Sequence, residues 1–323
     1  MKMVSKYAIV LTGFEDPMWP FLYEACSGEE KEKLIFFPTD RPDRATLQYS
    51  PINGEVIFRL KDKSIRGSEV QGIWLRRLVP PNFDHFERDL KEYCITEYNF
   101  FYEGLEYALP EIVWVSNPSA INKAQNKAYQ LSLVQKLGFH TLGTIFTNSP
   151  ATFAEILEID QTIYKAVRSP RIPLSKEMHS TVFTTKLSEE HLSIKDRIIS
   201  CPGILQTYCP KVADIRATIF GESIFTVKID SQKGENSKID FRNGAKFLDH
   251  SPHELPMDIS EKCLHLVKEM GLLYGAIDFA LLENGDYVFF EINPNGQWGW
   301  LEQKCNLPMR RALLNILFQK GNQ

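Results

Sequence analysis

The chain has 323 residues, about twice a typical domain length of roughly 150 residues, so two or three domains are expected. Its 37 Lys and Arg residues nearly balance its 41 Asp and Glu residues, and a net charge of −4 argues against a protein that coats nucleic acid or anionic membranes. Hydrophobic residues make up 43%, which excludes wholesale disorder, and no apolar run approaches the roughly 20 residues of a membrane-spanning helix. Without a signal-peptide pattern at its start, we expect a soluble, cytoplasmic protein that binds neither nucleic acid nor membranes.

The first third of the chain alternates short apolar runs with one long helical stretch. A helix is predicted near residues 86–109, and strands are predicted at residues 7–12, 33–37, 54–60, 72–75 and 112–116. Strands that alternate with a long helix are typical of α/β domains. We therefore predict an α/β domain over residues 1–117.

A second segment, residues 118–205, is predicted to form a central domain. Ser119 is a candidate N-cap, and apolar residues at three- and four-residue steps predict a helix over residues 120–137 that ends at Gly138. Residues 168–180 are rich in Pro, Lys and Arg and predict a mobile loop. Around this loop the pattern predicts a helix near 151–157 and strands at 143–147, 162–167 and 181–186.

The last segment, residues 206–323, has the texture of antiparallel sheet. A helix is predicted over residues 259–270, because Asp258 and Glu261 form a capping-box pattern ahead of it. A short helix is predicted near 309–318. The predicted strands are 204–208, 215–220 and 223–230, followed by a final hairpin over 276–293.

The final hairpin is predicted to place two carboxylates opposite each other. Its turn, Asn284-Gly285, is the strongest short hairpin signal. With a two-residue loop, Asp278 pairs with Glu291, and Asn293 projects from the same face two residues further on. The remaining residues predicted on that face are apolar: Ala276, Ala280, Leu282, Tyr287 and Phe289.

Two carboxylates in such a position repel each other unless a positive charge lies between them, because their Cβ atoms are about 5 Å apart. Oxygen ligands suit Mg²⁺, particularly where phosphate completes its coordination. We therefore predict a Mg²⁺ site at Asp278, Glu291 and Asn293. The alternative is that neighbouring Arg or Lys side chains neutralise the pair.

A second hairpin, with its turn at Gly221-Glu222, places Asp214 and Arg216 on one face together with Thr218. A cation and an anion on a largely apolar face either line a cleft or form a mutual ion pair. Both interpretations remain open from this segment alone.

The order of the polar motifs resembles that of the ATP-grasp ligases. The matching motifs are Asn117-Pro-Ser-Ala-Ile-Asn-Lys-Ala-Gln-Asn-Lys127, Tyr164-Lys165, Gln206-Thr-Tyr208, Asp214-Ile-Arg216, Asp240-Phe-Arg242-Asn243, Asp278 and Glu291-Ile-Asn293. Within that superfamily, the run from Glu291 to Glu302, with Gln297-Trp298-Gly299-Trp300, resembles the graspetide (microviridin-type) ligases. The resemblance implies an α/β (α+β) ATP-grasp fold, in which an N-terminal α/β domain precedes a central domain and a C-terminal antiparallel-sheet domain that sandwich ATP.

The resemblance also implies roles in nucleotide binding. Lys127 and Lys165 would contact the ATP phosphates. Asp214 would face the ribose, and Asn243 belongs to the cofactor-binding set. Three consecutive residues would form the linker that holds adenine through backbone groups: Gln206, Thr207 and Tyr208. One departure from the family is the absence of glycine in residues 168–180, where many ATP-grasp enzymes carry a glycine-rich loop over the phosphates.

For catalysis, the resemblance implies that Asp278, Glu291 and Asn293 bind one or two Mg²⁺ ions. Arg216 and Arg242 would stabilise the charge that develops on the transferred phosphoryl group.

The activity implied by the resemblance is that of an ATP-dependent carboxylate ligase acting on a ribosomal precursor peptide. An Asp or Glu side chain of the peptide would become an acyl phosphate, and a hydroxyl or amine of the same peptide would displace phosphate to close an ω-ester or ω-amide ring. A leader segment of the precursor would dock near residues 181–191, and the likeness is compatible with a homodimer. The alternatives are a ligase that adds amino acids to a protein or small acid, and a nucleotide-binding regulatory protein without turnover.

Overall fold

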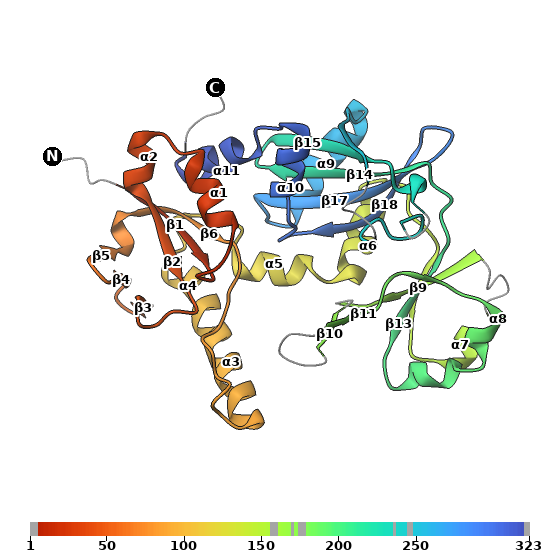
Figure 1. Ribbon diagram of the computed structural model, residues 1–323, viewed down its shortest axis with the longest axis horizontal. Coiled ribbons are helices and arrows are strands. Elements are labelled where there is room, and N and C mark those ends of the chain that lie inside the picture. Colours follow the sequence, from red (N-terminus) through yellow and green to blue (C-terminus); the bar gives the residue numbers. More distant parts are fainter. Residues whose placement is uncertain are drawn as a thin grey trace.

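The computed structural model describes residues 6–155, 161–168, 171–173, 179–234, 237–243 and 248–319. These residues form a mixed α/β architecture with five β-sheets (Figure 1). Within these ranges, none of the helices has the length and apolar character needed to cross a membrane.

The N-terminal part contains a parallel sheet with the strand order β2-β1-β6-β7. Its strands are β1 (Tyr7–Thr12), β2 (Leu34–Pro38), β6 (Val70–Leu75) and β7 (Val113–Val115). A separate antiparallel sheet consists of β3 (Ala45–Ser50), β4 (Glu55–Leu60) and β5 (Lys63–Arg66). The helices are α1 (Met18–Glu24), α2 (Gly28–Lys33), α3 (Arg88–Glu103) and α4 (Leu105–Ala108), with a 3₁₀ turn at Gly67–Glu69. The predicted strands are confirmed, whereas the predicted helix over 86–109 consists of two helices.

The predicted helix over residues 120–137 also consists of two helices, α5 (Pro118–Ala124) and α6 (Lys127–Lys136). The side chain of Asn117 caps α5, so the prediction of Ser119 as N-cap was wrong. Asn126 caps α6 by accepting hydrogen bonds from two backbone N–H groups of its first turn. This second cap starts a new helix and places Lys127 at its first position.

The central part contains a sheet with the order β12-β9-β13-β8, in which every pairing is antiparallel. Its strands are β8 (Thr144–Thr147), β9 (Thr162–Ala166), β12 (Thr185–Lys186) and β13 (Gly203–Thr207), and the accompanying elements are α7 (Pro150–Ala154), α8 (Glu189–Leu192) and a 3₁₀ helix at Lys195–Ile199. Because β13 extends past residue 205, we propose that the three predicted domains divide at residues 117 and 207.

The segment predicted as a mobile loop, residues 168–180, contains strands instead. β10 (Arg171–Pro173) and β11 (His179–Thr181) form an antiparallel pair. A two-stranded ribbon accommodates proline because it has edges without ladder hydrogen bonds. Residues 169–170 and 174–178 lie outside the described ranges, as do residues 156–157 of the helix predicted near 151–157. The strand predicted at 181–186 is interrupted, since β11 ends at Thr181 and β12 begins at Thr185.

The C-terminal part is built on a five-stranded antiparallel sheet with the order β16-β15-β14-β17-β18. Its strands are β14 (Ala213–Phe220), β15 (Ser223–Ile229), β16 (His250–Pro252), β17 (Tyr274–Leu281) and β18 (Tyr287–Asn293), and its helices are α9 (Met257–Glu269), α10 (Gly299–Cys305) and α11 (Met309–Leu317), with a 3₁₀ turn at Ser231–Lys233. α9 begins one residue before Asp258, so the predicted capping box is not formed. Pro256 occupies the cap position instead.

Asp278 lies opposite Glu291, as predicted, although the turn differs from the prediction. The backbone N–H of Leu282 donates to the carbonyl of Asp286 at 2.9 Å, which leaves three residues in the loop rather than two. Gly285 has φ +87°, the left-handed conformation expected at the end of a three-residue hairpin loop. This loop shifts the register near the turn by one residue.

A bulge restores the register before the carboxylates are reached. Asp278 pairs with Glu291 but Phe279 pairs with Phe289, so Phe290 is an extra residue on β18. Between the bulge and the turn, each β18 side chain therefore lies on the face of the sheet opposite to the one predicted. Tyr287 and Phe289, predicted on the carboxylate face, therefore pack with Phe279 on the opposite face. Phe290 lies on the carboxylate side instead.

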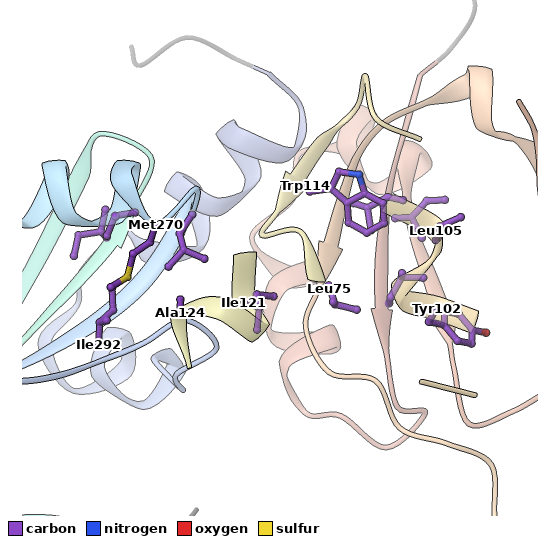
Figure 2. Packing of buried hydrophobic residues seen from close by; sticks show 14 of the residues in the cluster. Leu75, Tyr102, Leu105, Trp114, Ile121, Ala124, Met270 and Ile292 are labelled. Carbon is purple, nitrogen blue, oxygen red and sulfur yellow. The ribbon is translucent and has the colours of Figure 1, made fainter. Parts of the chain in front are cut away.

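One apolar cluster joins the N-terminal and C-terminal parts through α5. Figure 2 shows Ile121 and Ala124 of α5 between Leu75 of the N-terminal sheet and Met270 and Ile292 of the C-terminal part. Ile121 is 4% exposed and Ala124 is fully buried. This packing fixes the start of α6, and with it Lys127, against β18.

Candidate functional site

A pocket of about 300 Å³ lies between the central and C-terminal sheets. It receives side chains from α6, β9, β14, β17, β18 and the connections at 208–211 and 239–242. Eight of the predicted site residues line it: Lys127, Lys165, Tyr208, Asp214, Arg242, Asp278, Glu291 and Asn293.

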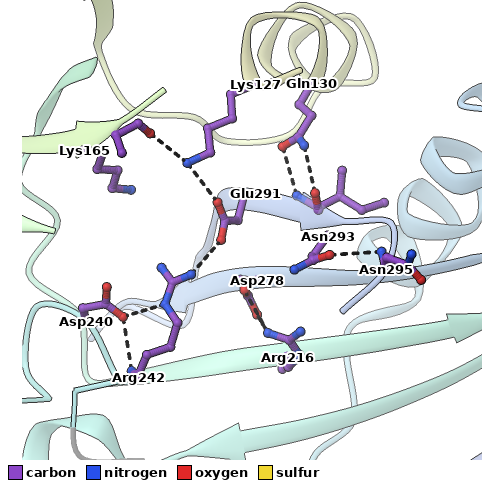
Figure 3. A network of polar contacts seen from close by, with 12 residues as sticks. Lys127, Gln130, Lys165, Arg216, Asp240, Arg242, Asp278, Glu291, Asn293 and Asn295 are labelled. Atoms are coloured by element: carbon purple, nitrogen blue, oxygen red, sulfur yellow. Dashed lines mark hydrogen bonds and ion pairs between the residues drawn. The ribbon is translucent and has the colours of Figure 1, made fainter. Parts of the chain in front are cut away.

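Glu291 is the centre of the charge network in this pocket (Figure 3). Lys127 Nζ lies 3.4 Å from its Oε2, and Arg242 Nη1 lies 3.3 Å from its Oε1. Burial alone would raise the pKa of Glu291, but the positive charges of Lys127, Arg242 and Lys165 outweigh burial and lower the pKa to about 2. Glu291 is therefore ionised throughout the physiological pH range.

Asp278 is held by a different cation. Arg216 Nη1 donates to both Asp278 carboxylate oxygens, at 3.0 and 3.1 Å, and both side chains are buried. Burial raises the pKa of Asp278 to about 6, although the charge of Arg216 opposes this shift. Arg216, predicted to stabilise the transferred phosphoryl group, is not among the residues that line the pocket. The mutual Asp214–Arg216 ion pair considered from the sequence is not formed.

Resident cations thus neutralise both carboxylates, as the alternative interpretation predicted. The same carboxylates nevertheless fit a Mg²⁺ site. Both line the pocket, and both retain acceptor capacity, since a carboxylate offers about four lone-pair sites. Asn293 adds an amide oxygen to the pocket, and this oxygen also accepts the backbone N–H of Asn295 at 3.0 Å.

Few side chains in this pocket could coordinate a metal ion. No group of three or more His, Cys, Asp or Glu residues that could hold a metal ion occurs in the part of the chain that the structure describes. Two carboxylates and one amide leave several coordination positions of Mg²⁺ unfilled, and Mg²⁺ commonly fills these with water and substrate phosphates. The site therefore suits a metal ion that arrives with a nucleotide.

The side chain of Lys165 bonds to the side chain of Gln206, one of the three residues predicted to hold adenine. Its Nζ donates to Gln206 Oε1 at 2.7 Å, and Gln206 Nε2 donates to Thr144 Oγ1 at 2.9 Å. Burial, together with nearby cations such as Lys127, outweighs the opposing charge of Glu291 and lowers the pKa of Lys165 to about 8. Lys165 is therefore a cation that a phosphate would stabilise.

The remaining residues predicted to bind the nucleotide differ in whether they line the pocket. Tyr208 lines the pocket, and its ring lies 4.8 Å from Lys186 Nζ. Thr207 is exposed, and its backbone N–H donates to Gly143 O, so it does not belong to the lining. Asn243 also lies outside the lining, and its backbone N–H donates to Asp240 O.

Asp214 pairs with Lys211, a residue that sequence reasoning missed. Lys211 Nζ donates to Asp214 Oδ1 at 2.7 Å and to the backbone carbonyl of Ile239 at 3.3 Å. Oδ2 of Asp214 is buried with no hydrogen-bond partner among the described residues. Burial raises the pKa of Asp214 despite the charge of Lys211. A ligand hydroxyl is the kind of group that would satisfy this oxygen.

Two further residues of the pocket were missed from the sequence. Gln130 lies one helical turn after Lys127, so helix periodicity could have placed it on the same face. Phe290 lies 4.9 Å (ring centroid) from Lys165 Nζ and 5.3 Å from Lys211 Nζ. No sequence signal indicated Phe290, because its orientation depends on the bulge in β18.

No protein-family model and no curated protein sequence matches the chain. Solved structures match it over nearly its whole length. Macrocyclase MdnC from Microcystis aeruginosa MRC, bound with precursor peptide MdnA, is 28% identical with a TM-score of 0.83, and the match covers 97% of this chain and 100% of that chain. Macrocyclase MdnB from the same organism is 25% identical with a TM-score of 0.74, covering 97% and 99%.

A third structure resembles the chain in fold. This RiPP-associated ATP-grasp ligase from Chryseobacterium gregarium, in complex with ADP and a leader and core peptide, is 23% identical with a TM-score of 0.86, and the match covers 98% of each chain. The fold, the pocket and the two macrocyclases agree with the order of motifs in the sequence. In fold and in the order of its motifs, the chain therefore resembles the ATP-grasp ligases of the graspetide (microviridin-type) family.

Proposed function

We propose that this ligase uses ATP and Mg²⁺ to activate Asp or Glu side chains of a ribosomal precursor peptide and to close ω-ester or ω-amide rings. The observation that carries the proposal is the convergence of Asp278 and Glu291 with Lys127, Lys165 and Arg242 around one pocket. Support comes from the similar structures. The MdnC structure holds precursor peptide MdnA, and the C. gregarium structure holds ADP with a leader and core peptide. A structure of the ATP-grasp ligase PsnB holds a minimal precursor, Mg and ADP.

In this proposal Lys127 and Lys165 hold the nucleotide phosphates. Both ammonium groups face the pocket, and the lowered pKa of Lys165 indicates an environment already rich in positive charge. The free Oδ2 of Asp214 accepts a ribose hydroxyl, and Tyr208 borders the adenine. Thr207 and Asn243 keep no direct role, because neither lines the pocket.

Asp278, Glu291 and Asn293 would hold Mg²⁺ together with the phosphates. Bound Mg²⁺ supplies charge neutralisation and orientation of the phosphoryl group that is transferred. Lys127 and Arg242, which pair with Glu291, would contact the phosphates instead once the nucleotide is bound. Arg242 then stabilises the transferring phosphoryl group, and Arg216 fixes the orientation of Asp278.

The reaction needs two displacements. A peptide carboxylate attacks the γ-phosphorus of ATP, so that ADP leaves and an acyl phosphate forms. A Ser or Thr hydroxyl, or a Lys amine, of the same peptide then attacks the acyl carbon and loses its proton, and phosphate leaves. The protein contributes positioning, charge stabilisation and exclusion of water.

For the precursor leader, we propose a second pocket of about 280 Å³ in the central part. It is lined mainly by apolar side chains around β12 and α8, including Phe153, Tyr164, Leu187, His191 and Ile198. This location matches the leader surface predicted near residues 181–191. An apolar leader segment that docks here would leave the core peptide free to reach the charged pocket.

A homodimer is also proposed. Of the residues of α3, only Tyr102 is buried, although the helix carries several large apolar side chains. Tyr93 is 61% exposed and Phe100 is 68% exposed. Figure 1 shows α3 projecting from the N-terminal part, where a second copy could cover these side chains. Light scattering of the purified protein tests this assignment, and a strictly monomeric mass would exclude it.

The proposed activity is tested by incubating the enzyme with ATP, Mg²⁺ and candidate precursor peptides rich in Ser, Thr or Lys and in Asp or Glu. Mass spectrometry should show the loss of one water per ring, together with ADP release. A gain in mass by whole amino-acid residues would instead identify an amino-acid ligase. Background ADP release with every peptide would favour a binding protein without turnover.

A further inference from the structure

Gln130 joins α6 to β18 by an unusual set of hydrogen bonds. Its Nε2 donates to the backbone carbonyl of Ile292 at 2.8 Å, and its Oε1 accepts the backbone N–H of Ile292 at 3.1 Å. The same Nε2 also donates to Ala124 O at 2.7 Å. The side chain is 3% exposed, so these bonds form in a water-poor environment. Figure 3 shows the amide of Gln130 facing the backbone of β18.

The position of Ile292 makes this contact important. Ile292 lies between Glu291 and Asn293, two of the three proposed Mg²⁺ ligands. β18 is an edge strand of its sheet, and Ile292 pairs with Ile277 on its other side. An edge strand has backbone groups without a neighbouring strand, so it can shift unless something binds them. Gln130 supplies both a donor and an acceptor, as a neighbouring strand would.

The same contact links the metal ligands to a phosphate-binding cation. Gln130 lies one turn after Lys127 on α6, and Lys127 Nζ lies 3.4 Å from Glu291 Oε2. The bulge at Phe290 directly precedes Glu291 and weakens the local β17–β18 ladder. The backbone of residues 291–293 is therefore held by β17 on one side and by Gln130 on the other.

We propose that Gln130 is a positioning residue that fixes Glu291 and Asn293 for Mg²⁺ and sets their distance from Lys127. This proposal rests on the proposed function, because it concerns the same Mg²⁺ site. All three side-chain hydrogen bonds of Gln130 go to backbone groups of the protein. Gln130 acts through the backbone of Ile292, in the way that residues behind metal ligands orient them.

The first test compares Gln130→Met with Gln135→Met. Methionine keeps the length of the side chain but removes all three hydrogen bonds, and Gln135 is an exposed residue of the same helix that serves as the matched control. Calorimetry measures ADP binding over a range of Mg²⁺ concentrations and without Mg²⁺. In Q130M the Mg²⁺ concentration for half-maximal effect should rise about 10- to 100-fold, whereas ADP binding without Mg²⁺ should not weaken. The Q135M variant should match the wild type.

A residue that only stabilised the fold would lower the melting temperature without changing the Mg²⁺ requirement. An unchanged Mg²⁺ requirement in folded Q130M would therefore overturn the proposal. If Q130M does not fold, Gln130→Asn replaces it, because its shorter amide is polar but cannot reach Ile292 in the same way. The same rise in Mg²⁺ requirement is expected for this variant, and its absence would count equally against the proposal.

The second test needs no ligand, so it separates this proposal from the proposed function. Hydrogen exchange of the Ile292 backbone N–H should be faster in Q130M than in the wild type and in Q135M. Unchanged exchange would show that Gln130 does not hold this backbone. A wild-type enzyme whose ADP binding ignores Mg²⁺ would instead overturn the proposed function.

Discussion

Arg242 Nη1 lies 3.3 Å from Oε1 of Glu291, so a cation proposed to stabilise phosphoryl transfer is held by a carboxylate proposed to bind Mg²⁺. Lys127 contacts the other oxygen of the same carboxylate. Mg²⁺ alone would have to compete with both cations. A nucleotide that attracts the two cations to its phosphates releases Glu291 for the metal, so nucleotide and Mg²⁺ should bind cooperatively.

The first prediction concerns Glu291→Gln. This change removes the charge that holds Lys127 and Arg242, so both cations become available to phosphate even without metal. Mg²⁺-free ADP should bind at least about tenfold tighter, because a charge pair near 4 Å is worth about 4 kcal/mol at an effective dielectric constant of about 20. Added Mg²⁺ should no longer improve binding, and ring formation should be lost. Calorimetry with and without Mg²⁺ measures both effects, and wild-type ligation by the variant would remove Glu291 from the metal site.

A second prediction follows from the pKa of Lys165, which burial lowers to about 8. Lys165 is protonated below pH 8 and loses its charge as the pH rises through 8, so phosphate binding should weaken in that range. Mg²⁺-free ADP affinity, measured from pH 6.5 to 9.5, should fall above pH 8. Lys165→Arg should bind ADP with a flatter profile, because arginine stays protonated. An identical pH profile in this variant would show that another group titrates.

The third prediction concerns the buried pair of Arg216 and Asp278. Arg216→Met leaves the Asp278 carboxylate without its partner, so the free energy of unfolding should fall by about 3 to 5 kcal/mol at pH 8. The pKa of Asp278 is raised to about 6 from an ordinary 3.8, and loss of Arg216 raises it further. A raised carboxyl pKa means that protonation favours the folded state, so the loss should shrink as the pH falls toward 6 and be smallest below 6, where Asp278 is protonated in both proteins. Urea unfolding at pH 8 and pH 5 measures this, and an equal loss at both values would contradict the assignment.

The fourth prediction tests the free oxygen of Asp214. If Oδ2 accepts a ribose hydroxyl, Asp214→Asn should reduce the preference for ADP over 2′-deoxy- and 3′-deoxy-ADP. A hydrogen bond to a charged group contributes about 1.5 to 3 kcal/mol, so the preference should change by roughly 10- to 100-fold. Competition binding measures the preference, and Asp249→Asn serves as an exposed control. A variant that still discriminates as the wild type does would place the ribose elsewhere.

The hairpin shows how far the sequence alone could lead. Asn284-Gly285 correctly indicated a hairpin, and Asp278 and Glu291 do lie opposite each other. The three-residue loop and the bulge at Phe290 were not visible, because they depend on how Phe289 packs against Phe279 and the rest of the core. The loop and the bulge each shift the register by one residue, and the two shifts cancel at Asp278 and Glu291. They do not cancel between the bulge and the turn, so the predicted faces were wrong there.

Local signals were sufficient where the interaction is local. Asn126, directly before Lys127, could have indicated the second helix, and Lys211 lies three residues before Asp214. The bonds of Gln130 to Ile292 join residues 162 positions apart, and no periodicity predicts them. The resident cations on the carboxylates likewise emerged only from the fold, since Arg242 comes from a connection between strands.

The most direct measurement is a crystal structure of the enzyme with ADP and Mn²⁺, which can replace Mg²⁺ at oxygen ligands. The anomalous signal of Mn²⁺ should lie between Asp278 and Glu291 and within coordination distance of a phosphate. Lys127 and Arg242 should have turned from Glu291 toward the phosphates. A metal signal elsewhere, with Glu291 still paired to Lys127 and Arg242, would contradict the account of this site.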